Sequence, residues 1–146
     1  MKPQVVAEDI ASGIKVTDEV VTAYDEVKQK HKFKYVTFKV SNCDTKIIVE
    51  DKVKESTWEE FQASFPKDGA RWSVYDFDYK NKEGQDRNKL ILVKWCPDTI
   101  KIKAKMMHSS SSHALKKTCP GVVIQASDRD ELNFDEVRDK ILQTSQ

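Results

Sequence analysis

The side chains that could react with a substrate or hold a metal are few and scattered. The three cysteines, Cys43, Cys96 and Cys119, lie far apart and form no Cys-x-x-Cys pair, so we expect reduced thiols. Cys96 precedes Pro97, and no histidine lies near it in the sequence to activate its thiol. The chain has no glycine-rich phosphate loop and no His-Glu-x-x-His motif. We therefore expect a protein that is not an enzyme, with no catalytic residue, metal ligand or cofactor.

The most informative segment is a lysine-rich stretch, 95–117, with the pattern of a helix. Pro97-Asp98-Thr99 is typical of a helix start, and Cys119-Pro120-Gly121 is typical of a helix end. At 100° per residue, one face of the helix is mostly apolar, which predicts packing against a sheet. That face carries Ile100, Ala104, Met107, Ser111, Ala114 and Leu115.

The opposite face of this helix is basic, yet it also carries two apolar side chains, Ile102 and Met106. Their polar neighbours are Lys105, Ser109, His113, Lys116 and Lys117, with Lys103 on the flank. Scattered apolar side chains are common on protein surfaces, so a solvated face is one interpretation. The other is a protein-docking face, with Ile102 and Met106 in a partner's apolar groove and a lysine rim against acidic groups. The pattern by itself leaves both open.

Composition limits the remaining classes of function. The chain has 146 residues, with 25 Lys plus Arg against 24 Asp plus Glu, which suits one domain and argues against a chain-wide nucleic-acid surface. No apolar run approaches the ~20 residues that cross a bilayer. The first residues also lack the apolar centre of a signal peptide. We therefore expect a cytoplasmic protein.

The elements that would position the lysine-rich helix follow from periodicity and turn residues. Strands alternate with helices, and two strand pairs look like hairpins, which indicates a mixed sheet with helices on both faces. The predicted elements are a flexible arm over 1–16, helices over 17–28, 57–65, 100–117 and 134–142, and strands over 33–40, 46–50, 71–79, 89–95 and 122–125.

Several motifs resemble the actin-depolymerising factor/cofilin family, whose fold is the ADF-homology domain. They are Ser12-Gly13-Ile14, Tyr75-Asp76-Phe77, Trp95-Cys96-Pro97-Asp98-Thr99, Lys103-Ala104-Lys105-Met106-Met107, Ser110-Ser111, Ala114-Leu115-Lys116-Lys117 and Gln125-Ala126-Ser127-Asp128. The matches run in family order from Ser12 to about Leu142. The resemblance implies an α+β, three-layer α/β/α, gelsolin-like fold with a mixed sheet of about five strands. It also implies a flexible extension over 1–11 and a single domain over 12–146.

The resemblance implies a function in actin turnover. Family members bind monomeric and filamentous actin, preferring the ADP-bound form, sever filaments and promote depolymerisation. The positions implied to contact both forms are Ser12, Gly13, Ile102, Lys103, Lys105, Met106, Ser110, Lys116 and Lys117. Those implied to contact filaments alone are Arg87, Lys89, Asp139 and Lys140. Gln143 stands where the family has a further basic residue. An alternative within the same fold is a coactosin-like module that binds filament sides without strong severing.

The resemblance also suggests forms of regulation. Ser12 matches a serine whose phosphorylation switches many members off, because a phosphate adds about two negative charges. Here the serine follows the 1–11 extension. Phosphoinositides would bind the patch of Lys101, Lys103, Lys105, Lys116 and Lys117. His113 could make binding pH-sensitive. The basic residues of Lys28–Lys34 themselves have three interpretations: an addition to the phosphoinositide patch, a weak nuclear-import patch, or a solvated loop. The second interpretation would add a nuclear pool. We expect a monomer with actin as partner.

Overall fold

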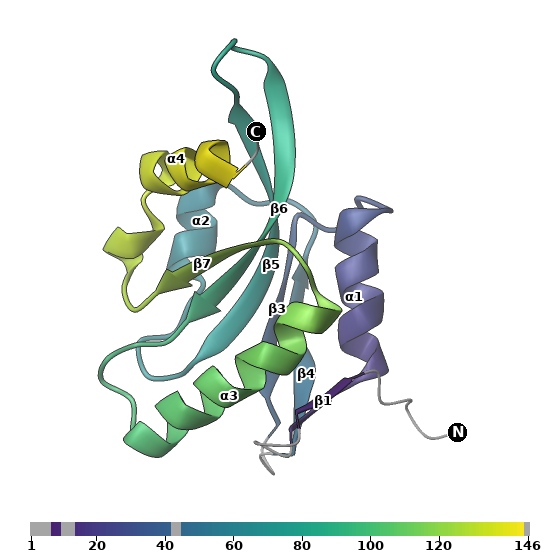
Figure 1. The fold of residues 1–146 in the computed structure, drawn as a ribbon, viewed down its shortest axis with the longest axis vertical. Coiled ribbons are helices and arrows are strands. Elements are labelled where there is room, and N and C mark those ends of the chain that lie inside the picture. Colours follow the sequence, from purple (N-terminus) through teal and green to yellow (C-terminus); the bar gives the residue numbers. More distant parts are fainter. Residues whose placement is uncertain (1–6, 10–13, 42–44, 145–146) are drawn as a thin grey trace.

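A computed structural model of the protein describes residues 7–9, 14–41 and 45–144. Seven strands form one sheet, with helices on both of its faces (Figure 1). In chain order the elements are β1 (Ala7–Asp9), β2 (Ile14–Val16), α1 (Asp18–Lys28), β3 (Tyr35–Val40), β4 (Lys46–Val53), α2 (Trp58–Ala63), β5 (Arg71–Lys80), β6 (Asp86–Trp95), α3 (Ile102–Thr118), β7 (Val122–Ala126), the 3-10 helix η1 (Arg129–Leu132) and α4 (Phe134–Thr144).

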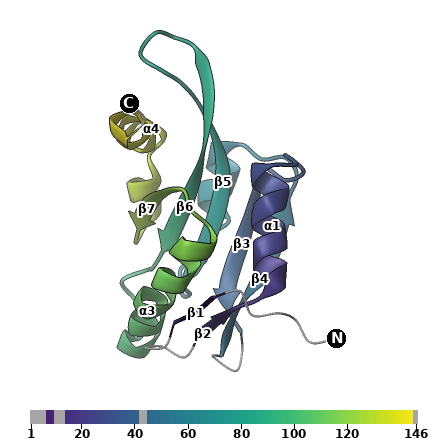
Figure 2. The ribbon, with the colours of Figure 1, turned by 45° about the vertical axis from the view of Figure 1, so that its right-hand side comes forward.

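The sheet is mixed, with strand order β1-β2-β4-β3-β5-β6-β7. Its centre is antiparallel, whereas β2 pairs with β4 and β6 pairs with β7 in parallel. The longest ladder joins β5 to β6, from Arg71 opposite Trp95 to Lys80 opposite Asp86. This hairpin extends beyond the rest of the sheet (Figure 2). Its turn suits Gly84, whose φ of 77° is left-handed and disfavours a side chain.

Two apolar cores lie on opposite faces of the sheet. Trp72 and Val74 of β5 face α1 and α3, whereas Tyr75, Phe77 and Tyr79 face α2 and α4. This separation follows from the strand period of two, which sends successive side chains to opposite faces. The three-layer α+β architecture predicted from the sequence is therefore confirmed.

Local sequence explains the start of α2, which supports the second core. The Thr57 side chain accepts a hydrogen bond from the Glu60 N–H, and the Glu60 carboxylate accepts one from the Thr57 N–H. This capping box satisfies two N–H groups at the helix start. The Trp58 indole N–H then donates to the Leu132 carbonyl at 2.7 Å, which joins α2 to η1.

The N-terminal region differs from the flexible arm expected over 1–16. Ile14 and Val16 are buried in the first core and Lys15 between them is exposed, so β2 is an integral strand. Ala7–Asp9 pairs antiparallel with β2 as strand β1. Each of these strands has three residues, too short for alternation to reveal in the sequence. They raise the sheet from the expected five strands to seven. Flexibility elsewhere in 1–11 stays a prediction.

Candidate protein-docking surface

Helix α3 is fixed to the sheet by its C-terminal two thirds. Leu115 is fully buried, and the Trp72 indole N–H of β5 donates to Ser112 Oγ at 2.9 Å. Ser112 Oγ in turn donates to the His108 carbonyl at 2.6 Å, within the helix. The buried residues of α3 are His108, Ser111, Ser112, Ala114 and Leu115.

Two predictions from the sequence were wrong for α3: where the helix begins, and which residues of its first turns are buried. The helix begins at Ile102, and neither Asp98 nor Thr99 caps it. The Thr99 hydroxyl instead donates to the Lys67 carbonyl at 3.2 Å. Ala104 is exposed, although the helical wheel placed it in the core. The physical reason is that the first turns of α3 are exposed, so the sheet covers only the later turns.

His108 is buried, although the helical wheel did not place it on the apolar face of the helix. Its side chain is 4% exposed and stacks on Trp72, with ring centroids 4.5 Å apart and planes at 18°. Neither ring nitrogen has a hydrogen-bond partner within the described residues. Burial, and secondarily the charge of Lys94, lowers the pKa of His108 to about 4. The imidazole is therefore neutral at physiological pH.

The first turns of α3 carry the two most exposed large apolar side chains of the described residues. Ile102 is 74% exposed and Met106 is 64% exposed, as the sequence predicted for the docking face. They border an open hollow of about 360 Å³ that is also lined by Lys103, Met107 and Ser110. Lys105 is half-buried. The arrangement offers an apolar contact bordered by cations, which suits a protein groove with an acidic edge.

The other residues expected at this face lie further away. Lys116 and Lys117 are exposed in the last turn of α3, where cations also complement the helix dipole. The charge of Lys116 contributes, after burial, to a lowered pKa of Lys94 on β6. His113 is exposed. Ser12 and Gly13 lie outside the described residues, between β1 and β2.

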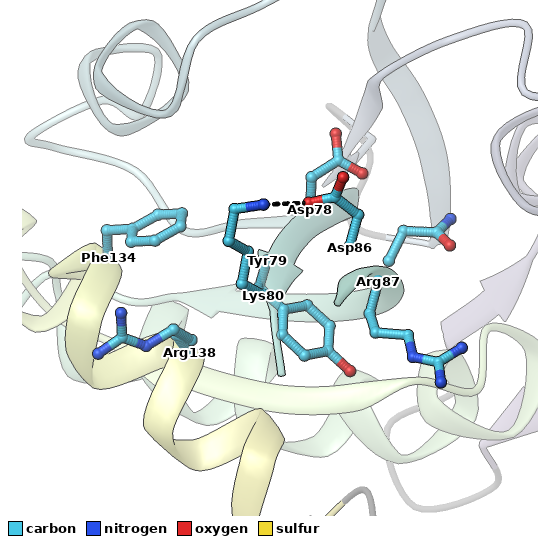
Figure 3. Close-up of a pocket in the computed structure, with 8 residues that line it drawn as sticks. Asp78, Tyr79, Lys80, Asp86, Arg87, Phe134 and Arg138 are labelled. Carbon is cyan, nitrogen blue, oxygen red and sulfur yellow. Dashed lines mark hydrogen bonds and ion pairs between the residues drawn. The ribbon is translucent and has the colours of Figure 1, made fainter. Parts of the chain in front are cut away.

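A second cleft, of about 730 Å³, lies between the β5–β6 hairpin and α4 (Figure 3). It is lined by Asp78, Tyr79, Lys80, Asp86, Arg87, Asn88, Phe134 and Arg138. Of the four expected filament contacts, only Arg87 lines it. Lys89 is half-buried on β6, and Asp139 and Lys140 are exposed on α4. The structure thus brings the hairpin and α4 together and places Arg87 in the cleft between them, whereas Lys89, Asp139 and Lys140 are not among its lining residues.

Phe134 and Arg138 are candidate contacts that sequence reasoning missed. Phe134 begins the last helix, predicted over 134–142, and is 38% exposed although it is a large apolar residue. One face of its ring stacks on Phe77, with centroids 4.9 Å apart. A partly exposed aromatic ring beside an arginine is a frequent protein-binding combination. The sequence signal for this exposure is the position of Phe134 as the first residue of the helix, where a side chain is only partly covered.

Comparison with known proteins decides the family. The model of the family described as cofilin/tropomyosin-type actin-binding protein matches residues 13–142. The chain belongs to this family. It is 38% identical to actophorin from Entamoeba histolytica over 133 residues, covering 89% of this chain and 96% of actophorin. It is 36% identical to cofilin from Schizosaccharomyces pombe over 132 residues, covering 89% and 96%.

Solved structures agree with this membership. The crystal structure of Streptomyces griseoflavus cofilin has a TM-score of 0.82 and 34% identity, covering 90% of this chain and 98% of that one. Coactosin from Entamoeba histolytica has a TM-score of 0.77 and 26% identity, covering 89% and 95%. Both likenesses extend over about nine tenths of this chain.

The two thiols of the described residues, Cys96 and Cys119, are held in their protonated form. Burial raises the pKa of Cys119 to about 12, and burial is also the main cause of a raised pKa at Cys96. A protonated thiol is a poor nucleophile and a poor metal ligand. Cys43 lies outside the described residues. Within the described residues, no helix is long and apolar enough to cross a membrane.

Proposed function

We propose that this cofilin-family chain binds monomeric and filamentous actin through the exposed face of α3, severs filaments and promotes their depolymerisation, with a preference for ADP-bound actin. The observation that carries the proposal is the exposure of Ile102 and Met106 beside lysines on a helix fixed to the sheet by its other face. Apolar side chains on a rigid support bind a groove at little cost in conformational entropy.

The residues on α3 divide the contact between apolar and charged groups. Ile102 and Met106 would enter an apolar groove of actin, and Ser110 would contact its edge. Lys103, Lys105, Lys116 and Lys117 would attract acidic groups around the groove. Ser12 and Gly13 would add the N-terminal contact to the same actin subunit.

Filament binding would need a second surface that touches the neighbouring subunit. We assign it to Arg87, Lys89, Asp139 and Lys140. Phe134 and Arg138 supply an aromatic and a cationic contact in the adjoining cleft. In Figure 1 the hairpin and α4 lie at the opposite end of the molecule from the start of α3, and Figure 2 gives the same separation. Two surfaces so placed suit simultaneous contact with two subunits.

Microscopy of single actin filaments tests the proposal. Adding the protein should increase the frequency of filament breaks and the rate of subunit loss from ends. The likeness to Entamoeba histolytica coactosin favours a second candidate, a module that binds filament sides without strong severing. Decoration of filaments without additional breaks would select that candidate. Failure to bind either monomers or filaments would exclude both.

Further properties of this proposal concern regulation and location. Phosphorylation of Ser12 would weaken actin binding through repulsion from acidic groups. Phosphoinositides would compete with actin for Lys101, Lys103, Lys105, Lys116 and Lys117. We propose a cytoplasmic monomer associated with the actin cytoskeleton, with a nuclear pool, and a binding protein rather than an enzyme.

A further inference from the structure

A second recess lies on the other flank of the first turns of α3. It has a volume of about 280 Å³. It shares Lys103 and Met107 with the hollow bordered by Ile102 and Met106. The side chains of Lys103 and Met107 therefore form the boundary between the recess and the hollow. Its lining residues are Lys39 and Val40 of β3, Ala70 and Arg71 at the start of β5, and Lys101, Lys103, Ala104, Met107 and His108.

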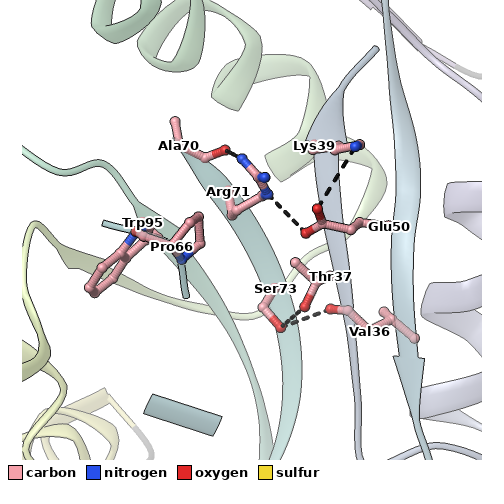
Figure 4. Close-up of polar contacts among 9 residues, drawn as sticks. All are labelled: Val36, Thr37, Lys39, Glu50, Pro66, Ala70, Arg71, Ser73 and Trp95. Atoms are coloured by element: carbon pink, nitrogen blue, oxygen red, sulfur yellow. Dashed lines mark hydrogen bonds and ion pairs between the residues drawn. The ribbon is translucent and has the colours of Figure 1, made fainter. Parts of the chain in front are cut away.

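The recess carries a marked excess of positive charge. Lys39, Arg71, Lys101 and Lys103 line it. Glu50 is the carboxylate that pairs with this group: Arg71 Nε donates to it at 2.8 Å, and Lys39 Nζ lies 3.8 Å from it (Figure 4). Lys101 and Lys103 form no ion pair within the part of the chain that the structure describes. Two of the cations are therefore available to an external anion.

The start of α3 adds to this positive potential. Lys101 is the N-cap residue and makes no side-chain hydrogen bond to the helix, and the first turn contains no acidic residue. The first N–H groups of a helix lack intrahelical acceptors and carry the positive end of its dipole. Independently, the recess includes His108, which is 4% exposed and whose ring nitrogens lack partners among the described residues.

We propose that this recess binds a carboxylate side chain of the protein partner, so that the docking surface extends from α3 onto the end of β3 and the start of β5. The proposal rests on the actin-binding function proposed above. Val40, Ala70 and Met107 supply apolar walls, which limit water around an entering carboxylate and strengthen its attraction to the cations. A single aspartate or glutamate of actin would supply the required charge.

Lys39 offers the sharpest test, because it belongs to neither of the surfaces assigned so far. Lys39→Ala should weaken actin-monomer binding about threefold, and Lys39→Glu about tenfold, since reversal adds repulsion to the lost attraction. Both losses should diminish at high salt. Lys101→Ala should resemble Lys39→Ala. Arg71 is avoided because its side chain also donates to the Ala70 carbonyl, so its loss would disturb the strand start.

Lys54→Ala is the matched control, because it removes one exposed lysine at the far end of β4. Val53 pairs with Tyr35 at the start of β3, whereas the recess lies at its end, where Val40 pairs with Ile47. The control should bind monomers as the wild type does. Thermal unfolding should confirm that every variant keeps its fold.

The outcomes separate this inference from the proposed function. If Lys39→Ala and Lys39→Glu bind monomers like the wild type, the recess is not part of the docking surface, and actin binding through α3 stands. An equal loss of monomer affinity in Lys54→Ala would show that the effect comes from overall charge, and would overturn the inference. Loss of binding to phosphatidylinositol-bisphosphate vesicles without loss of actin binding would assign the recess to lipid instead. A wild-type protein that binds no actin would overturn both proposals.

Discussion

Met106 and Met107 are adjacent in the chain but have different surroundings on α3. Met106 is 64% exposed, whereas Met107 is half-buried and packs against the core shared by α1 and α3. Because successive helical residues are separated by 100°, neighbours can face solvent and core respectively. The two methionines can therefore separate partner affinity from fold stability.

Met106→Ala should weaken actin-monomer binding and leave the free energy of unfolding nearly unchanged. Met107→Ala should lower that free energy by about 1–2 kcal/mol, less than the loss at a fully buried methionine, because the side chain is only partly covered. Urea unfolding and monomer-binding titrations of both variants measure the two effects. Equal loss of stability in the two variants would contradict the assignment.

His108 is a residue whose burial links the stability of the protein to pH. Its pKa is about 4 in the folded protein, against 6.5 for an ordinary histidine. Below pH 6.5 the unfolded chain takes up a proton that the folded protein does not, so stability falls as the pH decreases from about 6.5 towards 4. Above pH 6.5 the effect disappears, because both states are then neutral at this residue.

The predicted change can be measured by urea unfolding at pH 7.5 and 5.5. Between pH 7.5 and pH 5.5, the free energy of unfolding of the wild type should fall by about 1 kcal/mol because of His108. His108→Phe keeps a flat ring against Trp72 but has no group that titrates. Its free energy of unfolding should therefore fall by about 1 kcal/mol less than that of the wild type. His113→Gln is the control, because His113 is exposed, and it should behave as the wild type does. An unchanged pH dependence in His108→Phe would exclude His108 as the cause.

At the scale of the element, α3 has two parts with different tasks. Its later turns bury Ala114 and Leu115 against the sheet, and its first turns expose Ile102 and Met106. The absence of a side-chain cap leaves positive potential at the exposed end. A helix fixed at one end and exposed at the other can present its side chains without rearrangement of the core.

Lys103→Ala combined with Lys105→Ala should weaken the binding of monomers and filaments together. Both lysines lie at the exposed end of α3, so their loss removes charge from the contact that we propose the two forms of actin share. The expected loss is about tenfold, or about 1.4 kcal/mol of binding free energy. Monomer titration and filament cosedimentation measure it. Loss in one assay alone would contradict a shared surface.

At the scale of the whole molecule, the candidate surfaces lie on separate structural units. One is the start of α3, and the other is the β5–β6 hairpin with α4 (Figures 1 and 2). Each is supported by a different core, since α3 packs on the first and α4 on the second. Substitutions at one surface should therefore act independently of the other.

Arg87→Ala combined with Lys89→Ala should weaken filament cosedimentation and leave monomer binding unchanged. The pair lies on β6, in the hairpin that borders the cleft with α4, and not on α3, so only contact with a second subunit should be lost. Lys82→Ala, at the exposed hairpin turn, controls for the loss of charge. A similar loss of monomer binding in the double variant would contradict the division between the surfaces.

The sequence predicted most elements and the α3 face because these depend on local patterns. Periodicity located the main helices and central strands, and helical spacing put Ile102 and Met106 on the side opposite Leu115. The Thr57 cap and the long β5–β6 hairpin likewise follow from turn and cap residues near one another in the chain. Family motifs then indicated the partner, which composition could not.

The tertiary structure decided the features that depend on distant residues. His108 is buried because Trp72 of β5 packs against it, and nothing near it in the sequence indicates that contact. Strand β2 exists because β4 offers a pairing edge, and β1 in turn pairs with β2. Phe134 meets Arg87 and Arg138 at one cleft only because the hairpin and α4 are neighbours in space. Local propensity determines an element, but burial and pairing are set by whatever the rest of the chain brings beside it.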